Sequence, residues 1–354
     1  MKRVHKILLF VLLAVSIPVA GGYAIEPEQK ETQKEEKEMD VREFILEHVS
    51  DSYVWHITKI GEHEIGIPLP VILYSKTTGW HVFMSSVFHE NPVYEGFQIV
   101  HEGKYKGKIV EMSAAGEEVR PFDISITKNV FALLFSSILM IFCIMYVARS
   151  YKKNPLQSKS GFAGFMELFI MNINDDVIKP CIGKGYEKYA PYLLTVFFFV
   201  FTNNILGLIP IFPGGANVTG NIAITFVLAL ITFLIVNISG SKEYWKEIFW
   251  PDVPLWLKVP PMLPIIEMVG IFTKPFALMI RLFANMIAGH SMLAVFMMFI
   301  VMAGWTASLS YVGTMSVFAS VFVSLLELLV GALQAYIFTF LSAIFIGLYV
   351  EPAH

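Results

Sequence analysis

The sequence predicts an all-α polytopic membrane protein preceded by a small β-rich extracytoplasmic segment, and two observations carry this prediction. Of the 354 residues, 55% are hydrophobic and only 16% are charged, whereas an ordinary soluble domain has about a quarter charged residues. The charge is dense from Ile25 to about Phe122 and sparse in the long apolar runs after about Ile124. The net charge of −3 gives no reason to expect nucleic acid as a partner. We therefore divide the chain into residues 1–24, 25–122 and 123–354.

Residues 1–24 have the pattern of a secretory signal peptide. A basic start precedes the apolar run Ile7–Val19, and small residues that suit a cleavage site follow it. The alternative, a retained first helix, is disfavoured by Pro18 and the two glycines after it. A signal peptide would place the following segment outside the cytoplasm.

The segment 25–122 begins with a charged stretch and continues with short strands. Glu26–Asp40 is so poor in apolar residues that we expect a flexible tail. Beyond it, β-branched and aromatic runs separated by Gly, Pro and Asn predict a small antiparallel sheet. The expected strands are Tyr53–Ile60, Leu69–Tyr74, His81–Val87 and Phe97–Val110.

Histidines recur in these strands and their turns. None has the HExxH spacing that would place two histidines on one helical face around zinc. Exposed strand and turn histidines are therefore favoured over a weak metal site, and no cofactor is expected. The residues concerned are His56, His63, His81, His89 and His101.

Three ordinary membrane spans are predicted after residue 123, because about 20 apolar residues suffice to cross a bilayer. Gly161–Tyr189, between the first two spans, is too polar to cross and predicts an amphipathic helix lying at the interface. Basic residues gather in the connections 149–159, 179–188 and 242–258. The positive-inside rule then places the N-terminal segment outside and the C-terminus in the cytoplasm. The three spans are Val130–Val147, about Tyr192–Leu208 and about Asn221–Ile238.

The C-terminal third predicts a hairpin of two overlong helices. Pro261–Ala303 is one apolar stretch of 43 residues, which as a helix would be about 64 Å long, roughly twice the hydrocarbon thickness. It must either break into two spans or tilt strongly. Ser316–Val350 is nearly as long, and Ser308–Gly313 is the expected turn.

This hairpin carries polar residues that a lipid-facing helix should lack. Arg281 is the only arginine after Arg149, and an arginine at mid-bilayer costs at least about 2.5–3.5 kcal/mol. Snorkelling to the interface is the alternative, but apolar turns flank Arg281 on both sides. The polar set consists of Glu267, Lys274, Arg281, Asn285 and His290 on the first helix, and of Glu327 and Gln334 on the second.

Helical spacing and hairpin geometry arrange this set. At 100° per residue, Arg281 shares a stripe with Glu267, Lys274 and Asn285, whereas His290 lies on the opposite side. Folding the hairpin about its turn places Gln334 level with Arg281 and Glu327 level with His290. The pattern predicts two half-paths for protons or hydrated ions, separated by a guanidinium that does not deprotonate.

The run KPFALMIRLFANMIAGH, from Lys274 to His290, closely resembles the signature of subunit a of F-type ATP synthases, R-L-F-x-N-M-x-A-G. Further matches are LQAYIF at Leu333–Phe338 and TNNILGLIP at Thr202–Pro210. Together the resemblance covers most of the chain after about Gly161, with the helices in the same order. The leader and the outer segment depart from the short form of the family.

The resemblance implies a non-catalytic stator subunit of a rotary proton motor in the bacterial inner membrane. It implies that Arg281 faces the carboxylates of a rotating ring of c subunits, with Gln334 beside the arginine. His290 and Glu327 match a His/Glu pair of the family, and Glu267 and Asn204 match polar positions along two half-channels. Lys274 matches a family lysine of open role. The partners implied are the c-ring, the b-subunit peripheral stalk, the remainder of the synthase and the bilayer.

Other functions remain open at this point. A secondary transporter could bind an anionic substrate at Arg281, although we find no internal repeat of the kind such folds show. An intramembrane enzyme would need a catalytic motif such as HExxH or GxSxG, and a nucleotide site would need GxxxxGK[ST]; the sequence has none of these. A structural anchor would leave the cost of the interior polar residues unexplained.

Overall fold

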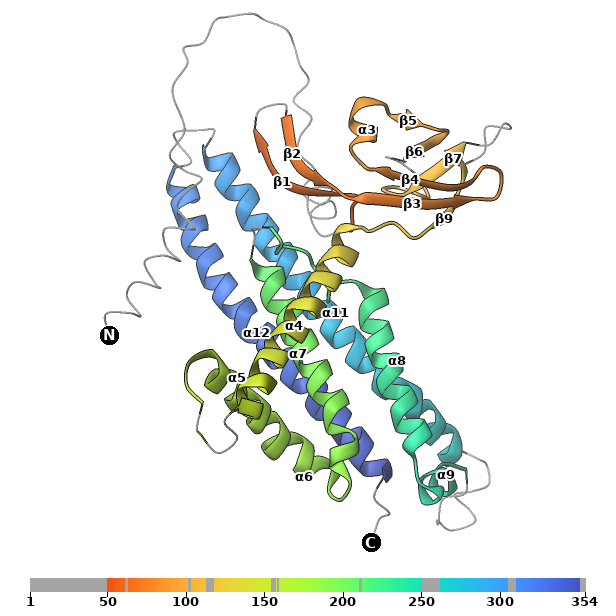
Figure 1. The fold of residues 1–354 in the computed structure, drawn as a ribbon, viewed down its shortest axis with the longest axis vertical. Coiled ribbons are helices and arrows are strands. Elements are labelled where there is room, and N and C mark those ends of the chain that lie inside the picture. The colour runs from red at the N-terminus through yellow and green to blue at the C-terminus, as the bar shows by residue number, and fades with distance from the viewer. Residues whose placement is uncertain are drawn as a thin grey trace, which may run out of the picture. The chain divides into compact units, whose positions relative to one another are not determined.

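The computed structural model describes residues 50–60, 63–100, 103–112, 118–153, 157, 159–209, 212–249, 262–304 and 310–350. The predicted signal peptide and charged tail lie outside the described residues. The described part is mostly helical and begins with a β-rich region, as the sequence predicts (Figure 1). Its two parts are a set of short strands up to residue 123 and the helices that follow.

The β-rich region forms three antiparallel sheets rather than one. The first pairs β1 with β2, the second has the order β4-β3-β9, and the third has the order β5-β6-β7-β8. The elements are β1 (Val54–Ile60), β2 (His63–Pro68), β3 (Pro70–Ser75), β4 (Gly79–Met84), the short helix α3 (Val87–Glu90), β5 (Val93–Tyr94), β6 (Phe97–Ile99), β7 (Ile109–Met112), β8 (Glu118–Val119) and β9 (Phe122–Asp123).

The predicted long strand Phe97–Val110 is wrong, because the chain reverses within it. β6 and β7 are separate strands that pair with each other, with Phe97 opposite Glu111 and Ile99 opposite Ile109. Gly103 and Gly107 lie between them with φ of 86° and 76°. Glycine adopts this left-handed backbone conformation at little cost, so the two glycines allow the reversal.

The core of the β-rich region contains aromatic and branched side chains from three strands and the residue before β1. Tyr53, Val71, Leu73, Phe97 and Ile109 pack together in this core. The Tyr53 hydroxyl donates a hydrogen bond to the Asp123 carboxylate. Burial, together with this carboxylate, raises the pKa of Tyr53 above its ordinary value.

The sheet runs into the first long helix without a free linker. After β9, the N–H groups of Ile124 and Ile126 donate to the carbonyls of Ile72 and Pro70, each at 3.0 Å. Helix α4 (Lys128–Lys153) begins two residues later. Its first turn is held by the Asp51 side chain, which accepts from the backbone N–H of residue 129 at 3.0 Å. The β-rich region is therefore tied to the start of α4 by backbone and side-chain hydrogen bonds.

Five helices in the described part of the chain are long and apolar enough to cross a membrane. This agrees with a multi-pass membrane protein. They are α4, α7 (Ala190–Leu208), α8 (Ile222–Ser239), α11 (Met262–Gly304) and α12 (Ser310–Val350). The short helix α9 (Lys242–Phe249) follows α8.

The hairpin differs from prediction at its turn. Helix α11 is one continuous helix of 43 residues that passes through Pro275, so the alternative of a break into two spans is excluded. Helix α12 begins at Ser310, and most of the predicted turn Ser308–Gly313 is therefore helical. The residues between the helices, 305–309, lie outside the described residues.

The predicted amphipathic helix within 161–189 is built from several pieces. Helix α5 (Gly161–Met171) continues through a π-helical segment (Asn172–Ile178) into the short α6 (Lys179–Ile182), and a 3₁₀ turn (Tyr186–Lys188) follows. None of these pieces is among the candidate spans.

The helices pack around α12, which contacts both α7 and α11, while α8 packs on α11 and α4 packs on α7 (Figure 1). Helix α12 also meets α6 near its end. A Cβ atom on Gly347 would overlap the backbone carbonyl of Cys181, so the two helix backbones touch at this point. Burial raises the pKa of the Cys181 thiol.

Candidate functional site

A buried ionisable pair joins the two helices of the hairpin. The Nε2 atom of His290 on α11 lies 3.9 Å from Oε1 of Glu327 on α12, and both side chains are buried. The hairpin geometry predicted that these residues would lie at the same depth, and the structure brings them together. Two ionisable groups are costly to bury in an apolar bundle, so the pair is a candidate functional site.

Glycines make the room for this pair. A Cβ on Gly289 would lie 2.6 Å from Oε1 of Glu327, and a Cβ on Gly207 of α7 would lie 3.3 Å from Nε2 of His290. Any larger residue at 289 would therefore displace the carboxylate. Helices α7, α11 and α12 therefore meet at a point where α7 and α11 each carry a glycine.

Asn204 connects the site to the loop after α7. Its side-chain nitrogen donates to the carbonyl of Gly331 on α12 at 2.8 Å, and its oxygen accepts from the Thr219 hydroxyl at 2.7 Å. Gly331 lies one helical turn beyond Glu327, so this amide sits on the same side of α12 as the carboxylate. A Cβ on Gly331 would lie only 3.1 Å from the Asn204 Cβ, so α7 and α12 also approach each other closely at this glycine.

Further buried polar residues extend this set toward α4, and sequence reasoning missed them. Ser136 of α4 donates to the Asn203 side chain at 2.9 Å, and Asn203 donates to the Phe199 carbonyl at 2.8 Å. Asn217, in the loop between α7 and α8, is also buried and accepts from the N–H of Gly220. The doubled Asn203-Asn204 within a span was the one signal in the sequence that could have found them.

Arg281 lies on the opposite face of α11 from His290. The buried face of α11 includes Leu278, Leu282, Met286 and His290, in successive turns. Arg281 is exposed, as are the small residues on its stripe, Ala277, Ala284, Asn285 and Ala288. Within the described residues Arg281 makes no hydrogen bond or ion pair. A guanidinium without a partner inside a bilayer is costly, so this exposed stripe is a candidate contact surface.

The remaining predicted residues are distributed along the hairpin. Gln334 is buried on α12, and no hydrogen bond joins it to Arg281 in the described part of the chain. Glu267 is exposed near the start of α11. The Nζ atom of Lys274 lies 5.9 Å from the centre of the Phe345 ring. Lys274 also lines a small cavity with Asn237 and Tyr244.

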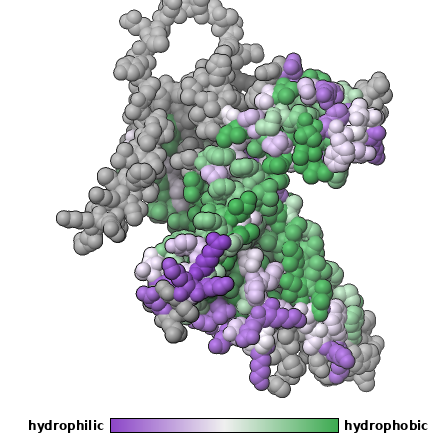
Figure 2. Space-filling view, viewed as in Figure 1, coloured by the Kyte–Doolittle hydropathy of each residue, from purple (hydrophilic) through white to green (hydrophobic). Residues whose placement is uncertain are grey.

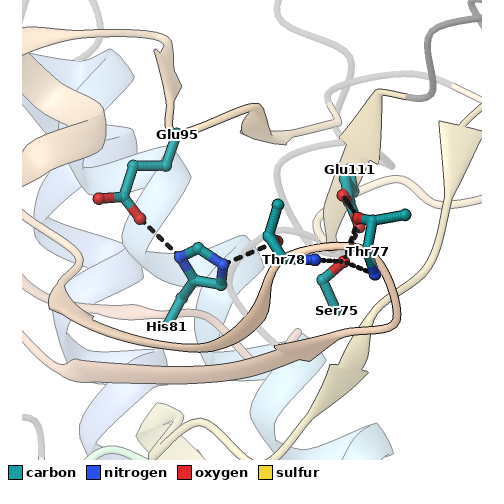
Figure 3. Close-up of polar contacts among 6 residues, drawn as sticks. All are labelled: Ser75, Thr77, Thr78, His81, Glu95 and Glu111. Carbon is teal, nitrogen blue, oxygen red and sulfur yellow. Dashed lines mark hydrogen bonds and ion pairs between the residues drawn. The ribbon is translucent and has the colours of Figure 1, made fainter.

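A second polar cluster lies in the β-rich region. His81 contacts Glu95 through Nδ1 at 2.6 Å and Thr78 through Nε2 at 2.8 Å (Figure 3). Beside it, the hydroxyls of Ser75 and Thr77 donate to the Glu111 carboxylate, and these bonds lower its pKa. No group of three His, Cys, Asp or Glu residues that could hold a metal occurs in the described ranges. The cluster ties the β3–β4 turn to the third sheet.

These features define a class: a multi-pass membrane protein that buries an ionisable pair on one face of a long helix and exposes an arginine on the other. Comparison with known families is more specific. The profile of the family described as ATP synthase A chain matches residues 130–347, which is more than half of the chain. The chain belongs to this family, and the family prediction is confirmed. A second profile, Domain of unknown function (DUF8433), matches residues 44–127.

Individual relatives agree with this assignment. The chain is 44% identical over 242 residues to "ATP synthase subunit a 2" of Chlorobaculum tepidum, covering 65% of each chain. It is 38% identical over 266 residues to "ATP synthase subunit a" of Chloroherpeton thalassium, covering 72% of each chain. A relative of the same name from Myxococcus xanthus is 36% identical over 69% of this chain and 80% of its own. The chain thus spans about two thirds of the length of such relatives.

Proposed function

We propose that this chain is the non-catalytic stator ion-channel subunit of a rotary ATP synthase. In this proposal it provides two offset half-channels for protons beside a rotating ring of c subunits, and Arg281 is the barrier between them. Family membership supports the general role. The b-subunit stalk and the remainder of the synthase are further proposed partners, and the proposed location is the bacterial inner membrane. The proposed topology has the N-terminal segment outside and the C-terminus in the cytoplasm.

One observation carries this proposal: the two faces of α11 differ in kind. His290 is buried against Glu327 on one face, while Arg281 is exposed on the other among small residues. A buried carboxylate and imidazole can exchange protons. A guanidinium stays charged, so it blocks a direct leak and attracts a carboxylate on a neighbouring surface. The small residues beside Arg281 would let such a surface approach closely.

The other residues are assigned by position. We place Asn204, His290 and Glu327 in the half-channel from outside, with Asn285 on the stripe between that half-channel and Arg281. Glu267 belongs to the half-channel toward the cytoplasm, and Lys274 lies on the same part of α11. Gln334, on α12, is proposed to lie beside Arg281 of α11 in the assembled complex.

The decisive experiment replaces Arg281 with Ala in the assembled complex. ATP-driven proton uptake into sealed vesicles should be lost, while the complex still assembles with its c-ring. Phe142→Ala is the matched control, because Phe142 is an exposed side chain of another span, α4. Unchanged pumping by R281A would show that Arg281 is not the barrier.

The alternative, a secondary transporter that binds an anionic substrate at Arg281, predicts a different result. Vesicles that contain this chain alone would then accumulate an organic anion, and R281A would abolish that uptake. Under the proposed function the chain alone moves no such anion.

A further inference from the structure

The three-stranded sheet β4-β3-β9 has an outward face made of large apolar side chains. Along β4, exposed and partly covered residues alternate, so that Trp80, Val82 and Met84 point outward. The register places Tyr74 of β3 between Trp80 of β4 and Phe122 of β9. The rings of Tyr74 and Trp80 lie 5.0 Å apart. We call this surface the outer apolar face, which comprises Tyr74, Trp80, Val82, Met84, Phe122 and the following Ile124.

These side chains are as exposed as those of the spanning helices. Trp80 is 62%, Val82 71% and Phe122 64% exposed, compared with 67% for Ile138 and 69% for Phe142 on α4. Soluble proteins rarely expose a large apolar patch to water. Where such a patch occurs, it commonly marks an interaction site. Figure 2 shows hydrophobic residues gathered on the β-rich region as well as on the helices.

The polar groups of the same sheet lie on its other side. His81 and Asp123 are directed inward, where His81 meets Glu95 and Asp123 meets the Tyr53 hydroxyl. No charged residue occupies an outward position of β3, β4 or β9. Beyond the strand ends, Lys76, Glu118 and Arg120 are exposed. The sheet is therefore amphipathic, with its apolar side outward and charged residues of both signs near its edges.

The position of this face along the chain identifies what covers it. Phe122 precedes the start of α4 at Lys128 by six residues, which span at most about 20 Å in extended form. The intervening backbone is fixed to β3 as far as Ile126, so the sheet cannot drift away from the helix end. Helix α4 is long and apolar enough to span the membrane, so the outer apolar face lies close to the end at which α4 would enter the bilayer.

We propose that the outer apolar face rests on the lipid bilayer itself, in the headgroup region of the leaflet that α4 enters. Tryptophan and tyrosine favour this region because their rings combine an apolar body with a polar group. Apolar faces of interfacial elements bury about 5–10 Å deep there. The exposed Lys76 and Arg120 would meet lipid phosphates. The proposal does not depend on the ion path, since it concerns only the sheet and the start of α4.

The test places a fluorescent label on the face in the full-length chain. Cys143 and Cys181 are first changed to Ala, and Val82→Cys is then labelled with an environment-sensitive dye in the complex reconstituted into vesicles. Val93→Cys is the matched control, because Val93 is 52% exposed but belongs to β5 in the third sheet. Quenchers carried by the lipid are compared with iodide in the water.

We expect lipid-borne quenchers to reduce the emission of V82C far more than that of V93C, and iodide to do the reverse. Equal quenching of both sites by iodide would overturn the proposal, as would equal quenching of both by lipid. If neither quencher reached V82C, a protein partner or a second copy would cover the face, and the bilayer would be excluded. In a chain labelled at Met84→Cys, adding Val82→Glu should weaken the quenching of the label by lipid-borne quenchers and strengthen its quenching by iodide. No shift would contradict the role of the face.

Discussion

The two polar sites of helix α11 differ in whether this chain completes them. His290 has its carboxylate neighbour at 3.9 Å, and glycines on α7 and α11 make the space for the pair. Arg281 lies on the opposite face, exposed among small residues, with no hydrogen bond or ion pair in the described part of the chain. The first site is therefore built by the folding of the described residues, whereas under the proposed function the second is completed by the ring of c subunits. Substitutions at the first site should act through internal geometry, and those at the second through assembly and transport.

The largest effect should come from the His290–Glu327 pair. His290→Glu alone places two carboxyl groups side by side, and Glu327→His alone places two imidazoles there; each should abolish most ATP-driven proton uptake. The double exchange restores one group of each kind and should recover part of the uptake. Sealed vesicles with a pH-sensitive dye measure all three variants. Recovery no better than in the single variants would show that the two residues act separately.

Gly289→Ala should have the next largest effect. The added methyl group meets the end of the Glu327 side chain at 2.6 Å. Because that side chain is flexible, the fold should survive while the carboxylate moves away from His290. Proton uptake should fall several-fold with little change in thermal stability.

Gly270→Ala is the control for this variant, since the same methyl group at Gly270 meets nothing within 4 Å. Gly270 lies on the same helix. Equal uptake by both variants would indicate that the room beside Glu327 is not needed.

Asn204→Leu should affect stability as much as transport. It leaves the Thr219 hydroxyl without its acceptor and removes the bond to the Gly331 carbonyl, and each buried group left unsatisfied costs about 1–3 kcal/mol. The melting temperature of the purified complex should fall. Adding Thr219→Val should cost less than it does in the native background, because its partner is already absent. Fully additive losses would argue against the Thr219–Asn204 bond.

The smallest effect is expected far from both sites, at Glu111. The hydroxyls of Ser75 and Thr77 lower the pKa of this carboxyl from its ordinary value of 4.5. A lowered folded-state pKa stabilises the β-rich region above the unfolded pKa, and this contribution is lost as the pH falls through the folded pKa. Glu111→Gln should therefore remove part of the acid sensitivity of the β3–β4 turn.

Hydrogen exchange of residues 75–79 in the intact chain, corrected for its intrinsic pH dependence, measures this sensitivity. Glu111 lies near the surface, where solvent screens the interaction, so the change should be slight. Identical pH profiles for E111Q and the native chain would mean that the hydroxyl bonds do not stabilise the turn.

The sequence predicted the spanning helices well, because apolar length is a local property that needs no tertiary information. It also predicted the meeting of His290 with Glu327, since two long helices joined by a short connection must pair at equal depths. The turn itself was wrong. Serine and glycine at 308–313 favour a loop in water, but the structure begins α12 at Ser310, because local preference is only a weak guide to where a helix begins.

The sequence analysis missed two other features, the buried polar residues around α7 and the separation of β6 from β7. Ser136, Asn203 and Thr219 are polar residues in or beside apolar segments, and their partners come from other elements. Strands β6 and β7 were merged, because their apolar residues continue on both sides of the turn marked by Gly103 and Gly107. The outer apolar face was hidden for a similar reason, since alternation alone does not tell which side of a strand is covered.

The contact of Gly347 with the backbone of Cys181 has a mechanical consequence. Since there is no room for even a methyl group between α12 and α6, the two backbones are in direct contact, and a movement of α12 at this point would require α6 to adjust. Glu327 lies 20 residues earlier on the same helix, about 30 Å away along the axis. Because a helix is stiff along its axis, the contact at Gly347 would help to set the position of the Glu327 carboxylate along that axis. The stiffness of the stator would then depend on a position that carries no side chain at all.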